Sequence, residues 1–269
     1  MKLIAEIGIN HNADMGMVKD LIDLAVVSGF DYVKFQKRNP EVCVPDNKKD
    51  ELKNTPWGPM TYLDYKYKME LGRKEYDEIY KYCENRIKCF ASVWDMDSAL
   101  FMIEYTDIVK IPSALITDIK LIELCKELYN VKIMSTGMST EREIEEAVKV
   151  FDPEVIMHTN SCYPSSIKEL NLNYINWLKD KYPDIEIGYS GHEYGLTTTY
   201  AAAGMGATWI ERHITLSHDL WGSDQKASID PVGCIKLVRG LRDIEKALGT
   251  KSERILFDSE KKKRDDLRK

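Results

Sequence analysis

The segment LIAEIGINHNAD, from Leu3 to Asp14, separates the two large classes of parallel-sheet fold. Its first part, Leu3–Gly8, is a short apolar run interrupted by one carboxylate, Glu6, and such a run is typical of a buried parallel strand. The loop that follows, Gly8–Asp14, lacks the G-x-G-x-x-G pattern with which a doubly wound dinucleotide-binding sheet usually opens. The segment therefore favours a closed barrel over an open sheet.

The rest of the chain repeats this unit. Seven more short apolar runs predict strands, at Tyr32–Gln36, Lys88–Ser92, Ile108–Pro112, Val131–Ser135, Val155–His158, Ile185–Ser190 and Trp209–His213. Stretches with helical spacing follow the strands, at Met15–Ser28, Lys74–Asn85, Asp97–Tyr105, Ile119–Leu128, Glu141–Phe151, Asn173–Lys181, Leu196–Gly204 and Val232–Gly249. This alternation predicts the α/β fold of a single-domain (β/α)8 TIM barrel over residues 1–250.

Two segments lie outside the repeat. Residues 38–72 are rich in Pro, Asn, Asp and Tyr, and they follow the second strand on the side where barrels carry their active sites. We expect an irregular substrate lid or rim there, because long loops in compact domains are often functional. Residues 251–269 are expected to be a solvated, charged C-terminal tail.

Composition excludes several classes of protein. The net charge of −6 argues against a nucleic-acid or anionic-membrane binder. No stretch approaches the roughly 18 apolar residues of a membrane span, and Glu6 interrupts the apolar run that a signal peptide would need. The six cysteines form no C-x-x-C pair, which predicts reduced thiols and a cytoplasmic protein.

Polar residues gather where the predicted strands end, which is where barrel enzymes carry their chemistry. A single buried lysine or histidine is more often structural than functional. Several charged groups at one rim are costly to bury without partners or ligands, so their convergence favours a site. The residues concerned are Glu6, Asn10, His11, Lys34, Gln36, Ser92, Lys110, Ser113, Ser135, His158, Ser190, His192, Glu211 and His213.

The residue types suggest a reaction. Lys34 and Lys110 offer cations for a small phosphate-bearing anion, and hydroxyls come from Ser113, Ser135 and Ser190. His192 and His213 follow adjacent strands and could bind a divalent metal that polarises an aldehyde. Glu6 is a candidate acid or base if burial raises its pKa.

Several motifs, taken in order, resemble the N-acetylneuraminate (sialic acid) synthase family. Ala5–Asn12 resembles the family's opening AEIGxNHxG motif. Further blocks match over Lys2–Gly249, at Val33–Gln36, Lys110–Ser113, Ser135–Met138, Tyr163–Pro164, Gly188–His192 and Ile210–Thr215. The resemblance implies a transferase that condenses phosphoenolpyruvate with an open-chain aldose of the mannose, mannose 6-phosphate or N-acetylmannosamine type. Its products would be a 3-deoxy-2-keto (nonulosonic) acid and phosphate.

The resemblance also implies roles for particular residues. His192 and His213 would bind Mn²⁺ or Mg²⁺, and Glu6, Lys34, Lys110 and His213 would be catalytic. Substrate would be bound by Asn10, Gln36, Ser92, Ser113, Ser135, Ser161, Tyr163, Ser190, Asp224 and Lys226. Within this set Gln36, Tyr163 and Asp224 would face the sugar, and a distal sugar phosphate would find its cations among Lys37, Arg38 and Lys226.

The sequence departs from the family pattern in four places. Gly191 replaces an aspartate, Leu115 replaces an acidic residue, and Ser92–Asp95 lacks a threonine. No counterpart of the family's C-terminal antifreeze-like domain, which reaches across a dimer, follows the eighth helix. We therefore expect a short form resembling 2-keto-3-deoxynononate or 2-keto-3-deoxynononate 9-phosphate synthases, with a homo-oligomer possible through the barrel faces.

Three alternatives stay open at this point. A 3-deoxy-octulosonate 8-phosphate synthase acting on arabinose 5-phosphate has a block similar to Ile111–Ser113. A Schiff-base aldolase would use Lys34 or Lys110 as its nucleophile. A non-catalytic sugar-binding protein could use the same barrel, because fold alone does not determine function.

Overall fold

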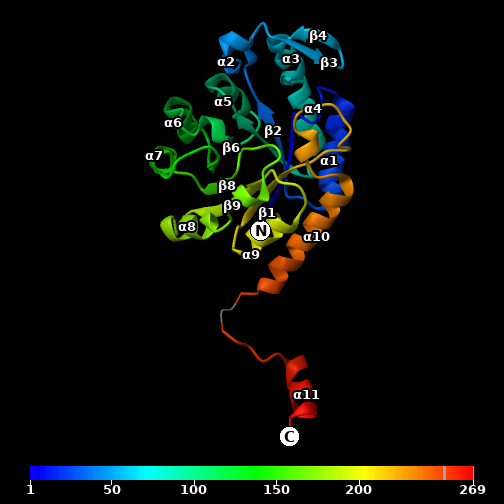
Figure 1. Cartoon of the computed structure of the whole chain (residues 1–269), viewed down its shortest axis with the longest axis vertical. Coiled ribbons are helices and arrows are strands. Elements are labelled where there is room, and N and C mark those ends of the chain that lie inside the picture. Colours follow the sequence, from blue (N-terminus) through cyan, green and yellow to red (C-terminus); the bar gives the residue numbers. More distant parts are fainter. Residues whose placement is uncertain (251–252, 269) are drawn as a thin grey trace.

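Eight parallel strands close into a barrel in the computed structural model, which describes residues 1–250 and 253–268 (Figure 1). Neighbouring strands around the barrel are β1, β10, β9, β8, β7, β6, β5 and β2. Their bounds lie within one residue of the predicted strands: β1 Lys2–Gly8, β2 Tyr32–Lys37, β5 Lys88–Val93, β6 Ile108–Ile111, β7 Val131–Ser135, β8 Val155–Thr159, β9 Glu186–Gly191 and β10 Trp209–His213. The predicted (β/α)8 barrel is confirmed.

The helices form the outer layer of the barrel. A capping box of Thr140 and Glu143 begins α7, and the Thr140 amide donates to the Glu143 carboxylate at 2.7 Å. The helices of the repeat are α1 Met15–Ser28, α4 Arg73–Cys83, α5 Met96–Met102, α6 Ile119–Leu128, α7 Glu141–Phe151, α8 Tyr174–Lys181, α9 Thr197–Gly204 and α10 Pro231–Leu248. Single turns of 3-10 helix, η2 Ser113–Leu115, η3 Ile167–Glu169 and η4 Gln225–Ala227, lie in the loops that follow β6, β8 and β10.

The barrel interior has an apolar floor. Tyr32 and Trp209 stack there with ring centroids 5.5 Å apart. Because side chains alternate along a strand, each of these residues is followed two positions later by one that also points inward, higher in the barrel. The floor consists of Ile4, Tyr32, Phe90, Ile133, Val155, Met157 and Trp209, and five of the residues two positions further on are Glu6, Lys34, Ser92, Ser135 and Glu211.

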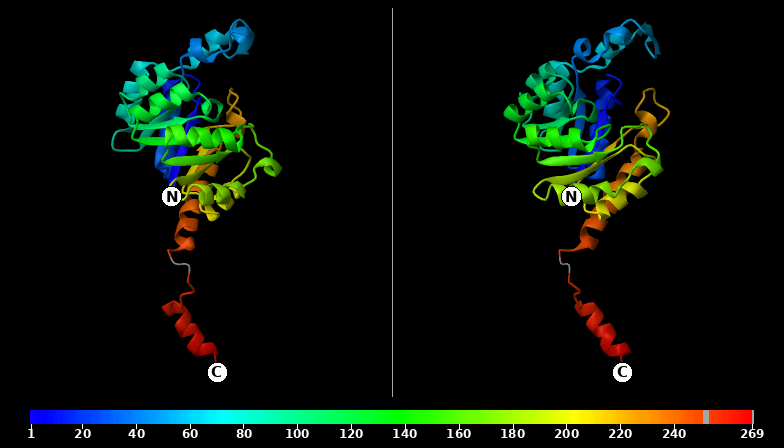
Figure 2. Two further views of the ribbon diagram at one scale, coloured as in Figure 1. Left: turned by 90° about the vertical axis from the view of Figure 1, so that its left-hand side faces the viewer. Right: turned by 60° about the vertical axis from the view of Figure 1, so that its left-hand side comes forward.

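The insertion at residues 38–72 has more structure than the sequence suggested. The expected irregular loop contains the short helix α2 Pro40–Cys43, the turn η1 Asp46–Lys48, a hairpin of β3 Leu52–Thr55 and β4 Gly58–Thr61, and the helix α3 Tyr62–Met69. The strands of this hairpin have four residues each, too short to produce a clear alternating pattern. The insertion extends from the end of β2, at the end of the barrel remote from the C-terminal helix (Figure 2).

The charged tail contains a helix, α11 Asp258–Leu267, that lies away from the barrel (Figure 2). None of its residues is buried. Across the described residues, no helix combines the length and the apolar character that crossing a membrane requires.

Candidate active site

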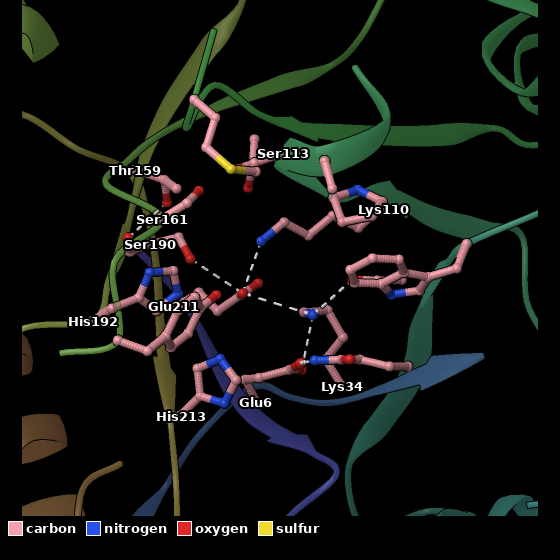
Figure 3. A pocket seen from close by; sticks show the side chains of 18 residues that line it. Glu6, Lys34, Lys110, Ser113, Thr159, Ser161, Ser190, His192, Glu211 and His213 are labelled. Carbon is pink, nitrogen blue, oxygen red and sulfur yellow. Dashed lines mark hydrogen bonds and ion pairs between the residues drawn. The ribbon is translucent and has the colours of Figure 1, made fainter. Parts of the chain in front are cut away.

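All eight strands direct side chains into one cavity of about 140 Å³ at their C-terminal ends (Figure 3). Twelve of the residues predicted for the site line this cavity: Glu6, Lys34, Gln36, Ser92, Lys110, Ser113, Ser135, Ser161, Tyr163, Ser190, His192 and His213. The alternation of side chains along a strand explains which residues reach the cavity. Lys34 and Gln36 share one face of β2, and Glu211 and His213 share one face of β10.

A buried network of two lysines and two carboxylates forms the base of the cavity. The Lys34 ammonium lies 2.8 Å from the Glu6 carboxylate and donates to the Ser92 hydroxyl at 2.8 Å. Lys110 donates to Glu211 at 2.7 Å, and Lys34 lies 3.6 Å from the same Glu211 oxygen. The four formal charges cancel, which is how such groups can stay buried in a barrel interior.

This burial changes the acidity of the network. Burial lowers the pKa of Lys110, although Glu211 opposes the shift. Burial alone would raise the pKa of Glu211, but Lys110 and Lys34 outweigh it and hold that pKa at about 2. Glu211 is therefore ionised across the physiological range, and it neutralises the cations that an incoming anion meets.

Hydroxyl groups surround Gly137, in the loop that follows β7. The Gly137 amide donates to the Ser113 hydroxyl at 3.1 Å. A Cβ atom at this position would lie 2.1 Å from the Ser161 hydroxyl oxygen, 2.7 Å from a Thr159 methyl carbon and 2.8 Å from the Ser113 hydroxyl oxygen. Glycine therefore lets three side chains close around the backbone, and together they form a polar cradle at the cavity wall. Buried Ser135 adds a hydroxyl that has no hydrogen-bond partner among the described residues.

The two histidines lie side by side at the rim of the same cavity. Their ring centroids are 5.4 Å apart, and Tyr163 stacks on His192 at 4.0 Å. The Nδ1 atom of His192 donates to the Asn160 carbonyl at 2.7 Å, which leaves its Nε2 free to bind another group. Burial, together with the neighbouring His213, lowers the pKa of His192 to about 3, so this imidazole is neutral.

These two imidazoles fit a divalent metal in two respects. A metal-bound histidine usually donates its second N–H to a carbonyl or carboxylate, as His192 does to Asn160. The Nδ1 atom of His213 is buried without a hydrogen-bond partner in the described part of the chain, and it lies 3.8 Å from Asp224. No group of three or more His, Cys, Asp or Glu side chains in that part could hold a metal ion. Water and substrate would therefore have to supply the other ligands.

A second buried ion pair, Arg212 with Glu193, lies outside the barrel behind β10, and each of its members directly follows or precedes one of the two histidines in the sequence. Arg212 points to the helix layer and donates to the Glu193 carboxylate at 3.1 Å and to Thr199 of α9 at 2.7 Å. A Cβ atom at Gly191 would lie 2.7 Å from the Glu193 carboxylate. Gly191 and Glu193 thus form a matched pair, because the carboxylate fills the space that a side chain at residue 191 would need.

Three residues predicted for substrate binding lie outside the cavity. The Asn10 amide is buried and donates to the Ile214 carbonyl and the Ser228 hydroxyl, both at 2.8 Å. Asn10 therefore joins the end of β1 to the loop after β10. Asp224 lies beside His213 at the edge of the cavity, and Lys226 lines a neighbouring cavity.

The cations suggested for a distal phosphate also differ in position. Lys37 donates to the Leu71 carbonyl at 2.9 Å and lies over the Phe101 ring, so it points away from the cavity. Arg38 stacks on Trp94 and contacts Gln36, which both line the cavity. Leu115, which replaces an acidic residue of the family pattern, packs against the apolar core between strands and helices.

Sequence reasoning gave no role to several residues of the cavity. Glu211 was noted as a strand-end residue, yet it forms the centre of the charge network. Glu211 lies two positions before His213 on the same strand, so the sequence already indicated that both side chains point into the barrel. Trp94, Pro112, Ala114, Met138 and Thr159 also line the cavity, but nothing in their residue types pointed to a site.

Comparison with known proteins agrees with this geometry. The sequence matches the NeuB family over residues 21–253. It is 34% identical to N,N'-diacetyllegionaminic acid synthase of Campylobacter jejuni over 259 residues, which cover 92% of this chain and 77% of that protein. Human N-acetylneuraminate-9-phosphate synthase is 33% identical over 94% of this chain and 73% of its own length.

Solved structures give the same result. The crystal structure of N-acetylneuraminic acid synthetase from Leptospira borgpetersenii superposes with a TM-score of 0.87 at 32% identity, covering 99% of this chain and 92% of that one. A 3-deoxy-D-arabino-heptulosonate 7-phosphate synthase from Thermotoga maritima, at 14% identity and a TM-score of 0.71, shares the fold alone. The family match, the relatives and the barrel agree, and the chain belongs to the NeuB family.

Proposed function

We propose that the protein is a metal-dependent transferase that condenses phosphoenolpyruvate with the open-chain form of an aldose, giving a 3-deoxy-2-keto nonulosonic acid and phosphate. The observation that carries the proposal is the meeting of Lys34, Lys110, His192 and His213 in one cavity. The names of the relatives support it, because they are synthases of legionaminic, pseudaminic and sialic acids.

Phosphoenolpyruvate would occupy the inner part of the cavity. Its phosphate and carboxylate are anions, and the hydroxyls of the Gly137 cradle and of Ser135 and Ser190 can donate hydrogen bonds to them. Lys34 and Lys110 bring positive charge to the same place, but Glu6 and Glu211 already cancel it. An additional cation would offset the charge of the bound anion, which is a physical reason to propose a metal here.

We propose Mn²⁺ or Mg²⁺ at His192 and His213, with Asp224 close to the second histidine. A divalent cation held there supplies Lewis-acid polarisation of the aldehyde oxygen. Tyr163 covers His192 from the solvent side, so it limits the space in which the aldehyde can lie. Gln36, which donates to Glu6 at 2.9 Å, offers an amide to the sugar hydroxyls.

The chain's own residues then direct the bond changes. Phosphoenolpyruvate, held by the lysines and hydroxyls, attacks the aldehyde carbon through its methylene carbon, and the aldehyde oxygen gains a proton to become a hydroxyl. Water adds to the former enol carbon, and loss of phosphate from that carbon leaves the keto group. We propose Glu6 as the residue that exchanges a proton with this water, since its carboxylate lies in the cavity beside Lys34.

The state of the cysteines supports our proposal of a cytoplasmic location. All six cysteines are free, and Cys83, Cys89, Cys125 and Cys234 are buried. Such usage supports a reducing, cytoplasmic location, which also stays a proposal. Association into a homo-oligomer stays a prediction.

The alternatives are less well supported. An octulosonate 8-phosphate synthase is not favoured, because the similar proteins above are nonulosonic acid synthases. A Schiff-base aldolase needs a lysine amine that is free to attack a carbonyl carbon, whereas Lys34 and Lys110 each contact a carboxylate within 3 Å. A binding protein without activity would gain nothing from so costly a buried network.

The test is phosphate release from phosphoenolpyruvate with Mn²⁺ and a panel of free and phosphorylated aldoses, followed by mass spectrometry of the product. We expect a product with the mass of the aldose plus the three-carbon unit, and activity that EDTA removes and Mn²⁺ restores. Irreversible labelling by pyruvate and borohydride would instead support the aldolase. No phosphate release with any aldose would refute the proposed reaction.

A further inference from the structure

The Arg212–Glu193 ion pair lies outside the barrel, yet it joins the two chain segments that carry the histidines of the site. Arg212 directly precedes His213 on β10, and Glu193 directly follows His192 after β9. The guanidinium and the carboxylate lie 3.1 Å apart, and both side chains are at most 1% exposed. A contact between residues 193 and 212 therefore also relates the positions of the two imidazoles.

The Arg212 guanidinium binds the main chain as well as its carboxylate partner. It donates to the Glu193 carbonyl at 2.5 Å and to the Gly195 carbonyl at 2.9 Å. A guanidinium is planar and presents its N–H donors in a fixed arrangement, so it holds these two carbonyls at set positions. The segment that follows His192 is thereby fixed relative to β10.

Three hydroxyl groups fix the Glu193 carboxylate in turn. It accepts hydrogen bonds from Tyr189 at 2.9 Å, from Thr198 at 2.6 Å and from Thr199 at 3.2 Å. The Thr199 hydroxyl also accepts from Arg212 at 2.7 Å. Tyr189 belongs to β9 and the two threonines to α9, so the carboxylate is anchored to a strand on one side and to the helix layer on the other.

Such a pair is a poor source of stability by itself. Taking both charges out of water is costly, and a well-packed apolar pair is often as stable. The hydrogen bonds of a buried ion pair have preferred directions, however, so they can select one arrangement of the chain where apolar contacts would allow several. The arrangement selected here includes the two imidazoles, whose ring centroids are 5.4 Å apart.

A cation shared by two histidines requires a definite separation of their rings. A histidine nitrogen binds zinc at about 2.0–2.1 Å, so two nitrogens on one such cation lie at most about 4 Å apart. A small displacement of either chain segment would lengthen one of the two bonds. The groups that hold these segments together are thus expected to influence how tightly the cation binds.

We propose that Arg212 and Glu193 are positioning residues that set the separation of the two imidazoles and thereby the affinity for the divalent cation. The inference rests on the proposed function, because it requires a cation at the histidines. It goes beyond that function by giving a role to two side chains that do not line the cavity and therefore touch neither cation nor substrate. Their effect on the site is transmitted through the main chain on either side of β9 and β10.

Arg212→Lys tests the proposal. Lysine keeps the charge but replaces the planar fork by a compact ammonium on a flexible stem, so the two carbonyls are no longer held together. We expect the Kd for Mn²⁺, measured by electron paramagnetic resonance without substrates, to rise tenfold or more. At saturating Mn²⁺, electron spin-echo envelope modulation should detect nitrogens of two histidines in the native protein and a weakened or missing coupling from one of them in the variant.

Arg242→Lys is the matched control. Arg242 of α10 donates to both oxygens of Asp31, at 2.8 and 2.7 Å, and to the Met1 carbonyl at 2.7 Å. Its partners precede β1 and β2, so they lie at the end of the barrel opposite the histidines. The control loses the same fork, and its Kd for Mn²⁺ should stay within about twofold even where its thermal unfolding midpoint falls. Equal losses of Mn²⁺ affinity in both variants would reveal a general effect on stability and overturn the proposal.

Thr199→Val is a milder change that serves if Arg212→Lys does not fold. It removes the hydroxyl that Arg212 and Glu193 share, and we expect the Kd for Mn²⁺ to rise about threefold. An unaltered Kd and unaltered nitrogen couplings in whichever of the two variants folds would overturn the positioning role, while Mn²⁺ binding by the native protein would leave the proposed function intact. Absence of Mn²⁺ binding to the native protein would instead refute the metal assignment, and this inference with it.

Discussion

Lys110 of β6 donates to Glu211 of β10 at 2.7 Å, across the inside of the barrel and between residues 101 positions apart in the chain. Lys34 of β2 lies 3.6 Å from the same oxygen. One carboxylate thus holds two buried lysine side chains close together. Because these side chains are at most 4% exposed, each partner depends on the others.

Replacement of Glu211 by Gln should destabilise the fold and lower activity. The amide keeps the shape but leaves two buried ammonium groups with Glu6 as their remaining carboxylate partner in the cavity. Breaking a buried pair costs about 3–5 kcal/mol, so we expect the free energy of unfolding to fall by about 3 kcal/mol in urea titrations. Glu84→Gln, at an exposed residue of the helix layer, is the control. Equal unfolding midpoints for the native protein and Glu211→Gln would contradict the network.

Gly137→Ala should weaken phosphoenolpyruvate binding. The added methyl would lie 2.1 Å from the Ser161 hydroxyl oxygen, and the cradle must open to admit it. We expect KM for phosphoenolpyruvate to rise tenfold or more in steady-state assays, equivalent to about 1.4 kcal/mol. Gly204→Ala makes the same change in α9, where nothing lies within 4 Å, and should leave KM unaltered. An unaltered KM in Gly137→Ala as well would remove the cradle from the site.

His213→Ala should abolish turnover with little loss of folding. The ring supplies one of two imidazoles at the proposed metal position and is not part of the apolar core. Manganese binding, followed by electron paramagnetic resonance, should weaken at least tenfold, while the thermal unfolding midpoint changes by a few degrees. Native protein treated with EDTA and resupplied with Mn²⁺ is the reference. Full activity in the variant would refute the metal assignment.

Lys66 of α3 lines the same neighbouring cavity as Lys226, so the use of a phosphorylated aldose should decline above neutral pH. Burial, followed by the Arg38 guanidinium, lowers the pKa of Lys66 to about 8, while Asp224, Glu70 and Cys43 oppose the shift. Lys66 is thus charged at pH 7 and largely neutral at pH 9, whereas the phosphate, with its second pKa near 6, stays doubly charged. We expect KM for mannose 6-phosphate, but not for mannose, to rise over this range.

Lys66→Arg provides the matched test of this pH dependence. A guanidinium stays charged up to pH 9 and beyond, so the rise in KM should be flattened in this variant. An identical pH profile in Lys66→Arg and the native protein would show that another group titrates.

The barrel and most of its cavity could be predicted from the sequence for a definite reason. A strand buried on both faces needs a continuous apolar run, so a charged residue inside one, such as Glu6, Lys110 or Glu211, stands out as a functional candidate. The family motifs lie at the ends of successive predicted strands, so they predicted that these residues meet at the C-terminal end of the barrel. The structure adds which charges pair, because pairing depends on distances across the barrel that a one-dimensional pattern does not contain.

The positions that the sequence could not resolve have equally specific causes. Asn10 is as polar as Gln36, and only the hydrogen bonds to Ile214 and Ser228 reveal that its amide is already used. Lys37 follows Gln36 on β2, and consecutive strand residues point to opposite faces, so its side chain turns away from the cavity that Gln36 lines. The neighbouring cavity, between the insertion and the loop after β10, could not be foreseen, since Trp57 and Trp221 meet only after the barrel closes.

The insertion at residues 38–72 has its own hairpin and helix and leaves the strands unbroken. The insertion and the strand-end side chains therefore belong to different parts of the chain. Substitutions in the insertion can reshape the entrance to the barrel without disturbing the residues that line the cavity below it.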